Sequence, residues 1–162
     1  MMRDQADSKR SEQAQEFLSV QVGEQEYAID IRSIREIRGW IASTQLPYAP
    51  DFIKGMINLR GSVLVVVDLA RRLGVGYIDP KPASVVVVVE HGDRVAGLLV
   101  DAVCDIVTVT DEMRQNTPAT GSDLPKSYIE GLVMMENRIV GILSVAAVIP
   151  DERMQAMAEE LA

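Results

Sequence analysis

The most distinctive polar residue in this 162-residue chain is Arg60, in the run Asn58-Leu59-Arg60-Gly61 between two strongly apolar segments. Asn58 and Gly61 are residue types typical of tight turns, so the run predicts a hairpin turn that presents Arg60. A guanidinium can form paired hydrogen bonds to a carboxylate, and arginine is enriched where proteins bind each other. We therefore expect Arg60 to be a recognition residue. A purely structural turn with a solvated arginine is the alternative.

Residues that could support catalysis are scarce. His91 is the only histidine, and it lies at an expected hairpin turn, which favours a solvated residue over a general base. Cys104 is the only cysteine, and we expect a small core or half-buried residue because Asp101 and Asp105 disfavour a thiolate. One histidine and one cysteine make a transition-metal site improbable, and no glycine-rich phosphate-binding motif is present. The residues predict no enzyme, no metal and no cofactor.

Charge and composition exclude several classes of partner. The net charge is -8 and the pI is near 4.7, which argues against nucleic acid and against anionic lipid as the main partner. No apolar run approaches the roughly 20 residues that a membrane-spanning helix needs, and the N-terminal stretch lacks the apolar core of a signal peptide. We expect a cytoplasmic protein with no direct membrane insertion. Hydrophobic residues make up 48% of the chain but aromatic residues only 4%, so the core must be aliphatic.

One sequence element occurs twice. The pattern of residues 17–37 recurs without a gap 69 residues later, and that of residues 55–69 recurs 76 residues later. The apolar positions are kept, but the Arg60 turn becomes Met-Met-Glu-Asn at 134–137. A structural turn could have kept its residues in both copies. The duplication therefore predicts a symmetric scaffold with an asymmetric binding site.

Many short strands, tight turns and very short helices predict an all-β fold of two small barrels with about five strands each. The expected divisions are a disordered tail at 1–15, one domain at 16–149 with repeats at 16–74 and 84–149 interleaved around a shared core, and a C-terminal helix at 150–162.

Several motifs in order resemble the CheW family of chemotaxis coupling proteins. They are E-Y-x-I-D-I and R-E-I-R-G within 16–40, and F-I-K-G-x-x-N-L-R-G within 49–74; the stretches 85–107 and 128–149 follow the family as well. The resemblance implies two five-stranded SH3-like barrels around a shared core. It also implies a non-enzymatic adaptor that binds the C-terminal regulatory domain of the CheA histidine kinase and the cytoplasmic tip of methyl-accepting chemotaxis receptors. Such an adaptor would be cytoplasmic and recruited to membrane receptor arrays.

The resemblance also implies functional positions. Arg60, with Asn58 and Gly61 shaping its turn, falls at a position tied to coupling and receptor contact, and Ile34 and Glu36 fall at positions implicated in receptor binding. The weaker interface candidates are Arg38, Trp40, Lys54 and Gly55. Trp40 fits an exposed anchor and a cover over the core equally well.

The expected mechanism is docking of an amphipathic receptor helix in an aliphatic groove between the barrels. Ile34 would bury apolar area there, while Arg60 and Glu36 would fix the register. Two alternatives remain open from the sequence. One is an adaptor of the same fold for a kinase pathway outside chemotaxis. The other is a small-ligand carrier that uses the groove between the barrels.

Overall fold

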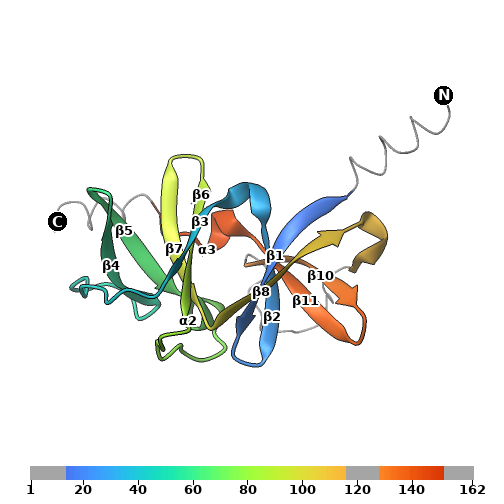
Figure 1. Ribbon diagram of the computed structural model, residues 1–162, viewed down its shortest axis with the longest axis horizontal. Helices are drawn as coiled ribbons and strands as arrows, with labels where there is room; N and C mark the ends of the chain where they lie inside the picture. The colour runs from blue at the N-terminus through green and yellow to red at the C-terminus, as the bar shows by residue number, and fades with distance from the viewer. Residues whose placement is uncertain (1–13, 116–127, 152–162) are drawn as a thin grey trace.

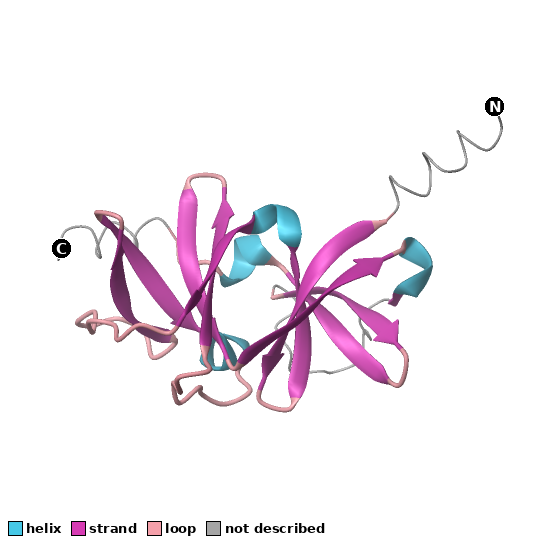
Figure 2. Cartoon of the chain, viewed as in Figure 1, coloured by secondary structure: helices cyan, strands magenta, loops and turns pink. Residues whose placement is uncertain are grey.

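Two curved β-sheets lie side by side and form two lobes (Figure 1, Figure 2). The computed structural model describes residues 14–115 and 128–151. The strands are β1 (Gln15–Val22), β2 (Gln25–Asp30), β3 (Ile34–Gly39), β4 (Ile53–Leu59), β5 (Ser62–Asp68), β6 (Val85–His91), β7 (Arg94–Val100), β8 (Ala102–Val109), β9 (Arg114–Gln115), β10 (Ile129–Met135) and β11 (Arg138–Leu143). The helices are η1 (Ile31–Ser33), α2 (Leu69–Leu73), η2 (Asp111–Met113) and α3 (Val145–Val148). The predicted all-β class, with two small barrels and short helices, is confirmed.

Each lobe takes strands from both sequence repeats. The first lobe has the strand order β8-β1-β2-β11-β10-β9, and the second lobe has the order β3-β6-β7-β5-β4. The leading hairpin of each repeat therefore pairs with later strands of the other repeat. In the first lobe β2 pairs with β11, and in the second β7 pairs with β5, and both of these pairings are parallel. Because the hairpins are exchanged, neither repeat contains a complete lobe.

The two lobes close in the same way. In the first lobe the chain runs from β8 through η2 into β9, which pairs with β10 on the far edge of the sheet. In the second lobe the chain leaves β3 and reaches β4 at an isolated bridge between Thr44 and Met56. The two-residue strand β9 makes the first sheet six-stranded, where about five strands were expected. Closure leaves little free sheet edge in either lobe.

An aliphatic core joins the lobes, as the composition predicts. One cluster of buried side chains includes Val20 and Ile29 from the first lobe together with Val66 and Leu98 from the second. A smaller cluster, which includes Phe17, lies within the first lobe. Burial of this much apolar surface across the junction holds the two lobes together.

Helix α2 begins and ends where the sequence indicates. Asp68 is its N-cap and Gly74 ends it with a left-handed φ of 74°. The Asp68 carboxylate is almost fully buried, and it also accepts a hydrogen bond of 2.8 Å from the backbone N–H of Ile78. This buried carboxylate attaches the linker after α2 to the second lobe.

Parts of the predicted organisation concern residues outside the described ranges. Residues 1–13 of the predicted tail lie outside them, while Gln15 is already the first residue of β1. The predicted C-terminal helix at 150–162 falls almost entirely on residues 152–162, which are also outside them, and positions 150 and 151 are not helical.

Candidate functional site

The turn between β4 and β5 presents Arg60 to solvent. Arg60 and Gly61 have left-handed φ angles of 51° and 85°, which is the pattern of a two-residue type I′ hairpin turn. The Asn58 side-chain carbonyl accepts a hydrogen bond of 3.0 Å from the backbone N–H of Gly61. Asn58 and Gly61 therefore shape the turn, as predicted from their types. The Arg60 side chain is 75% exposed.

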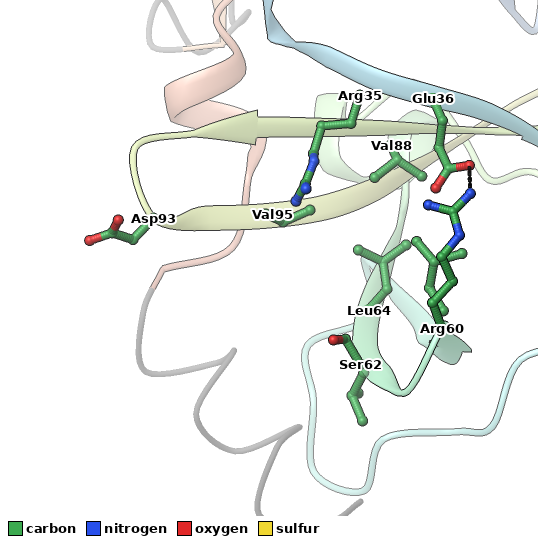
Figure 3. A pocket seen from close by; sticks show the side chains of 10 residues that line it. Arg35, Glu36, Arg60, Ser62, Leu64, Val88, Asp93 and Val95 are labelled. Atoms are coloured by element: carbon green, nitrogen blue, oxygen red, sulfur yellow. Dashed lines mark hydrogen bonds and ion pairs between the residues drawn. The ribbon is translucent and has the colours of Figure 1, made fainter.

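Arg60 forms an ion pair with Glu36, 24 residues earlier in the chain. The distance from Arg60 Nη2 to Glu36 Oε2 is 3.2 Å (Figure 3). Glu36 lies on β3, at one edge of the second sheet, and the Arg60 turn follows β4, at the other edge. The ion pair thus bridges the two edges of the lobe. Both residues were expected at the site from the sequence, but their contact was not.

An open groove of about 530 Å³ lies beside this ion pair. The apolar side chains of Leu64, Val88 and Val95 lie between the charged groups of Arg35 and Glu36 on β3 and of Arg60 on the turn (Figure 3). The other lining residues are Leu59, Ser62, Val63 and Asp93. All ten belong to the second lobe. The expectation of a groove between the barrels is therefore wrong for this groove, which is formed by the curvature of a single sheet.

The other candidates on β3 and beyond it have different surroundings. Arg38 Nη1 lies 3.9 Å from Glu36 Oε2, so Glu36 stands between two guanidinium groups. Ile34 is half-buried against the shared core and does not line the groove. Trp40 is also half-buried against this core, and its backbone N–H donates to the carbonyl of Ser84. The geometry favours Trp40 as a cover over the core.

Lys54 and Gly55 lie at the opposite end of β4 from Arg60. Lys54 lines a separate pocket of about 240 Å³ together with Arg71 and Tyr77, so it does not join the Arg60 groove. A Cβ atom on Gly55 would lie 2.6 Å from both Ser43 Oγ and the Thr44 carbonyl oxygen. Gly55 therefore allows the preceding loop to approach β4, which is a packing role.

The matching turn in the first lobe has the opposite charge. Glu136 occupies the position of Arg60 and has nearly the same φ, 52°. Its neighbour Arg138 pairs with Glu26 at 3.1 Å and lies 3.7 Å from Glu136. The same hairpin exposes Met134 and Ile139, opposite each other on β10 and β11. The backbone symmetry is kept while the surface chemistry differs, as the two sequence copies indicate.

An ion pair between Asp30 and Arg32 stabilises the turn that leads into β3. Asp30 accepts hydrogen bonds from the Arg32 side chain at 2.8 and 3.2 Å and from the Arg32 backbone N–H at 2.9 Å. The side-chain hydrogen bond from Arg32 is the main reason that the pKa of Asp30 is lowered. Asp30 thereby caps η1, the turn that carries the chain from the first lobe to the second.

The two residues considered for catalysis are both exposed. His91 lies at the end of β6, as expected of a solvated turn residue. Cys104 was expected to be a small core or half-buried residue, and this expectation is wrong: Cys104 is exposed, as the extra residue of a bulge in β8. Within residues 14–115 and 128–151, no group of three His, Cys, Asp or Glu side chains is placed to hold a metal ion. None of the helices in these segments has the length and apolar character needed to span a bilayer.

A two-lobed β scaffold with an open, charged groove fits a binding protein of the adaptor class, and comparison with known proteins agrees. The family model of the CheW-like domain matches residues 16–153. "Chemotaxis protein CheW" of Rhizobium meliloti is 42% identical over 87% of this chain and 91% of the relative. "Probable chemotaxis protein CheW" of Rhizobium etli is 41% identical over the same shares. The crystal structure of scaffolding protein TtCheW from Thermoanaerobacter tengcongensis superposes with a TM-score of 0.77 at 26% identity, over 85% of this chain and 89% of that one.

The chain belongs to the CheW-like family. It is a chemotaxis scaffolding protein and not an enzyme.

Proposed function

We propose that this chain couples methyl-accepting chemotaxis receptors to the CheA histidine kinase at membrane-associated arrays, and that the receptor tip docks at the Arg60 groove. The observation that carries the proposal is the exposed arginine, held in a left-handed turn and paired with Glu36 beside a groove of mixed polar and apolar lining. A surface arginine in a conformation that favours glycine or asparagine is unfavourable for folding alone. Glu136 has nearly the same φ at the equivalent turn of the first lobe, so the argument for recognition rests on the exposed positive charge of Arg60 beside the groove.

The groove suits an amphipathic helix. The half-buried side chains of Leu59, Val63 and Val95 offer apolar area, while Leu64 and Val88 are buried beneath them. The flanking charges alternate in sign, which can fix the register of a helix. A carboxylate on the helix would bind the Arg60 guanidinium alongside Glu36, since the existing pair uses only Nη2 of the planar group. Ile34 and Arg38 remain proposed contacts that would extend the site along β3.

Co-sedimentation tests the proposal. Receptor-containing membranes are mixed with the kinase and with wild-type chain, Arg60→Ala or Arg138→Ala. Arg138 is the matched control, since it forms an ion pair of similar length on the equivalent hairpin of the first lobe. We expect wild type and Arg138→Ala to bring the kinase down with the membranes and Arg60→Ala to fail. Equal recruitment by all three proteins would exclude the Arg60 groove as the docking site.

A further inference from the structure

Arg72 occupies the junction between the two lobes. Its guanidinium carbon lies 4.1 Å from the centre of the Phe52 ring and 4.9 Å from that of the Tyr128 ring. Phe52 directly precedes β4 in the second lobe, and Tyr128 directly precedes β10 in the first. These two rings are 76 residues apart, so they are equivalent positions of the duplication. One cation is therefore stacked between matching aromatic residues of the two lobes.

The backbone carbonyls at the end of α3 accept hydrogen bonds from side chains of the second lobe. The last carbonyls of a helix have no partner within the helix. Arg72 donates to the Ala147 carbonyl at 3.1 Å and to the Val148 carbonyl at 3.3 Å, and Arg94 on β7 donates to the Ala146 carbonyl at 3.2 Å. Helix α3 follows β11 of the first lobe. Two arginines of the second lobe thus bind three successive carbonyls of α3, the helix that follows the last strand of the first lobe.

From this arrangement we propose that Arg72 is a positioning residue that fixes the angle between the lobes, and that kinase coupling depends on that angle. The second part of the proposal rests on the proposed adaptor function. Apolar burial holds the lobes together but is non-directional, so it tolerates small rotations. The hydrogen bonds and the two ring contacts of the Arg72 guanidinium are directional, so they favour one orientation of the lobes. An adaptor that contacts two partners passes a signal between them only while its parts keep a defined relation.

A distance measurement tests the structural part without any partner. Spin labels are placed on the native Cys104 in the first lobe and on His91→Cys in the second, since both positions are exposed. Double electron–electron resonance then gives the distance distribution between the lobes. We expect Arg72→Met to broaden or shift this distribution. Arg71→Met is the matched control, because Arg71 pairs with Asp51 and stacks on Tyr77 within the second lobe. An unchanged distribution in folded Arg72→Met overturns the proposal.

A second variant covers the case in which Arg72→Met does not fold. Arg94→Met removes one of the three carbonyl contacts and leaves the ring stack in place, so a smaller broadening is expected. No change with this variant, combined with loss of folding for Arg72→Met, would show that Arg72 serves stability alone and would also overturn the proposal.

Kinase activity in receptor membranes tests the functional part. We expect Arg72→Met to recruit the kinase to membranes as the wild type does but to lose activation, whereas a merely structural residue would affect both or neither. Activation equal to wild type by the variant overturns the functional part. Failure of the wild type itself to activate the kinase would instead count against the proposed function, and the distance measurement would still decide the role of Arg72.

Discussion

Replacing Arg60 with asparagine separates folding from recognition. A left-handed conformation costs an ordinary residue about 1–2 kcal/mol, and asparagine tolerates it better, most of all before glycine in a type I′ turn. The variant also loses the ion pair with Glu36. Because Arg60 is 75% exposed, that pair is worth only about 0.2–1 kcal/mol. The two effects oppose each other, so the free energy of unfolding should stay within about 1 kcal/mol of wild type, a melting shift of at most roughly 2–4 °C.

Binding should respond very differently. If Arg60 is an interface anchor, its removal costs about 2 kcal/mol or more, which is roughly a 30-fold loss of affinity for receptor membranes. Thermal denaturation and a membrane-binding titration measure the two quantities. Glu136→Asn is the matched control, since Glu136 has the same left-handed φ in the first lobe. Unchanged affinity of Arg60→Asn would refute the recognition argument, and a melting temperature lowered by more than about 4 °C would refute the strain argument.

Three further predictions concern the second lobe and η1, the turn that leads into it. The charge swap Glu36→Arg with Arg60→Glu should re-form the ion pair, with a small loss of stability because the new guanidinium at position 36 faces Arg38, but it should not restore receptor binding; recovered binding in co-sedimentation would show that the pair itself is what matters. Gly55→Ala should cost about 1–3 kcal/mol in urea unfolding because its Cβ meets the loop before β4, and a smaller loss would contradict the packing role. Asp30 has a lowered folded-state pKa, so its stabilisation exists above the unfolded value near 3.8 and is lost as pH falls through the folded pKa. Acid titration of Asp30→Asn should therefore show a flatter loss of stability below that pH, and an unchanged slope would exclude the Arg32 pairing.

Local features of the fold could be predicted from the sequence because they depend on neighbouring residues. Gly23 and Gly92 end up at matching turns with φ angles of 61° and 60°. The apolar run at 85–89 becomes β6, which is buried in the shared core. The exchange of hairpins between lobes could not be predicted in the same way. Strand pairing is non-local, and the pattern within β1 or β6 does not say which later strand it joins.

The candidate site shows the same division. The roles of Asn58 and Gly61 in the turn follow from their types, and the structure shows them in those roles. The contact between Glu36 and Arg60 depends on closure of the whole sheet, which no local pattern records. The misjudged exposure of Cys104 has a related cause. A bulge adds one residue to a strand and so changes which face the side chain occupies, and Arg35 is the equivalent bulge residue in β3.

Kinase autophosphorylation in receptor-containing membranes, measured with and without this chain and then with Arg60→Asn, tests whether the chain couples receptor to kinase through Arg60. We expect the wild-type chain to raise kinase activity and make it sensitive to attractant, and the folded variant to do neither. If the wild-type chain and the kinase and receptors of the same organism give no activation, the scaffold remains a CheW-like protein but the proposed coupling of receptor to kinase is contradicted.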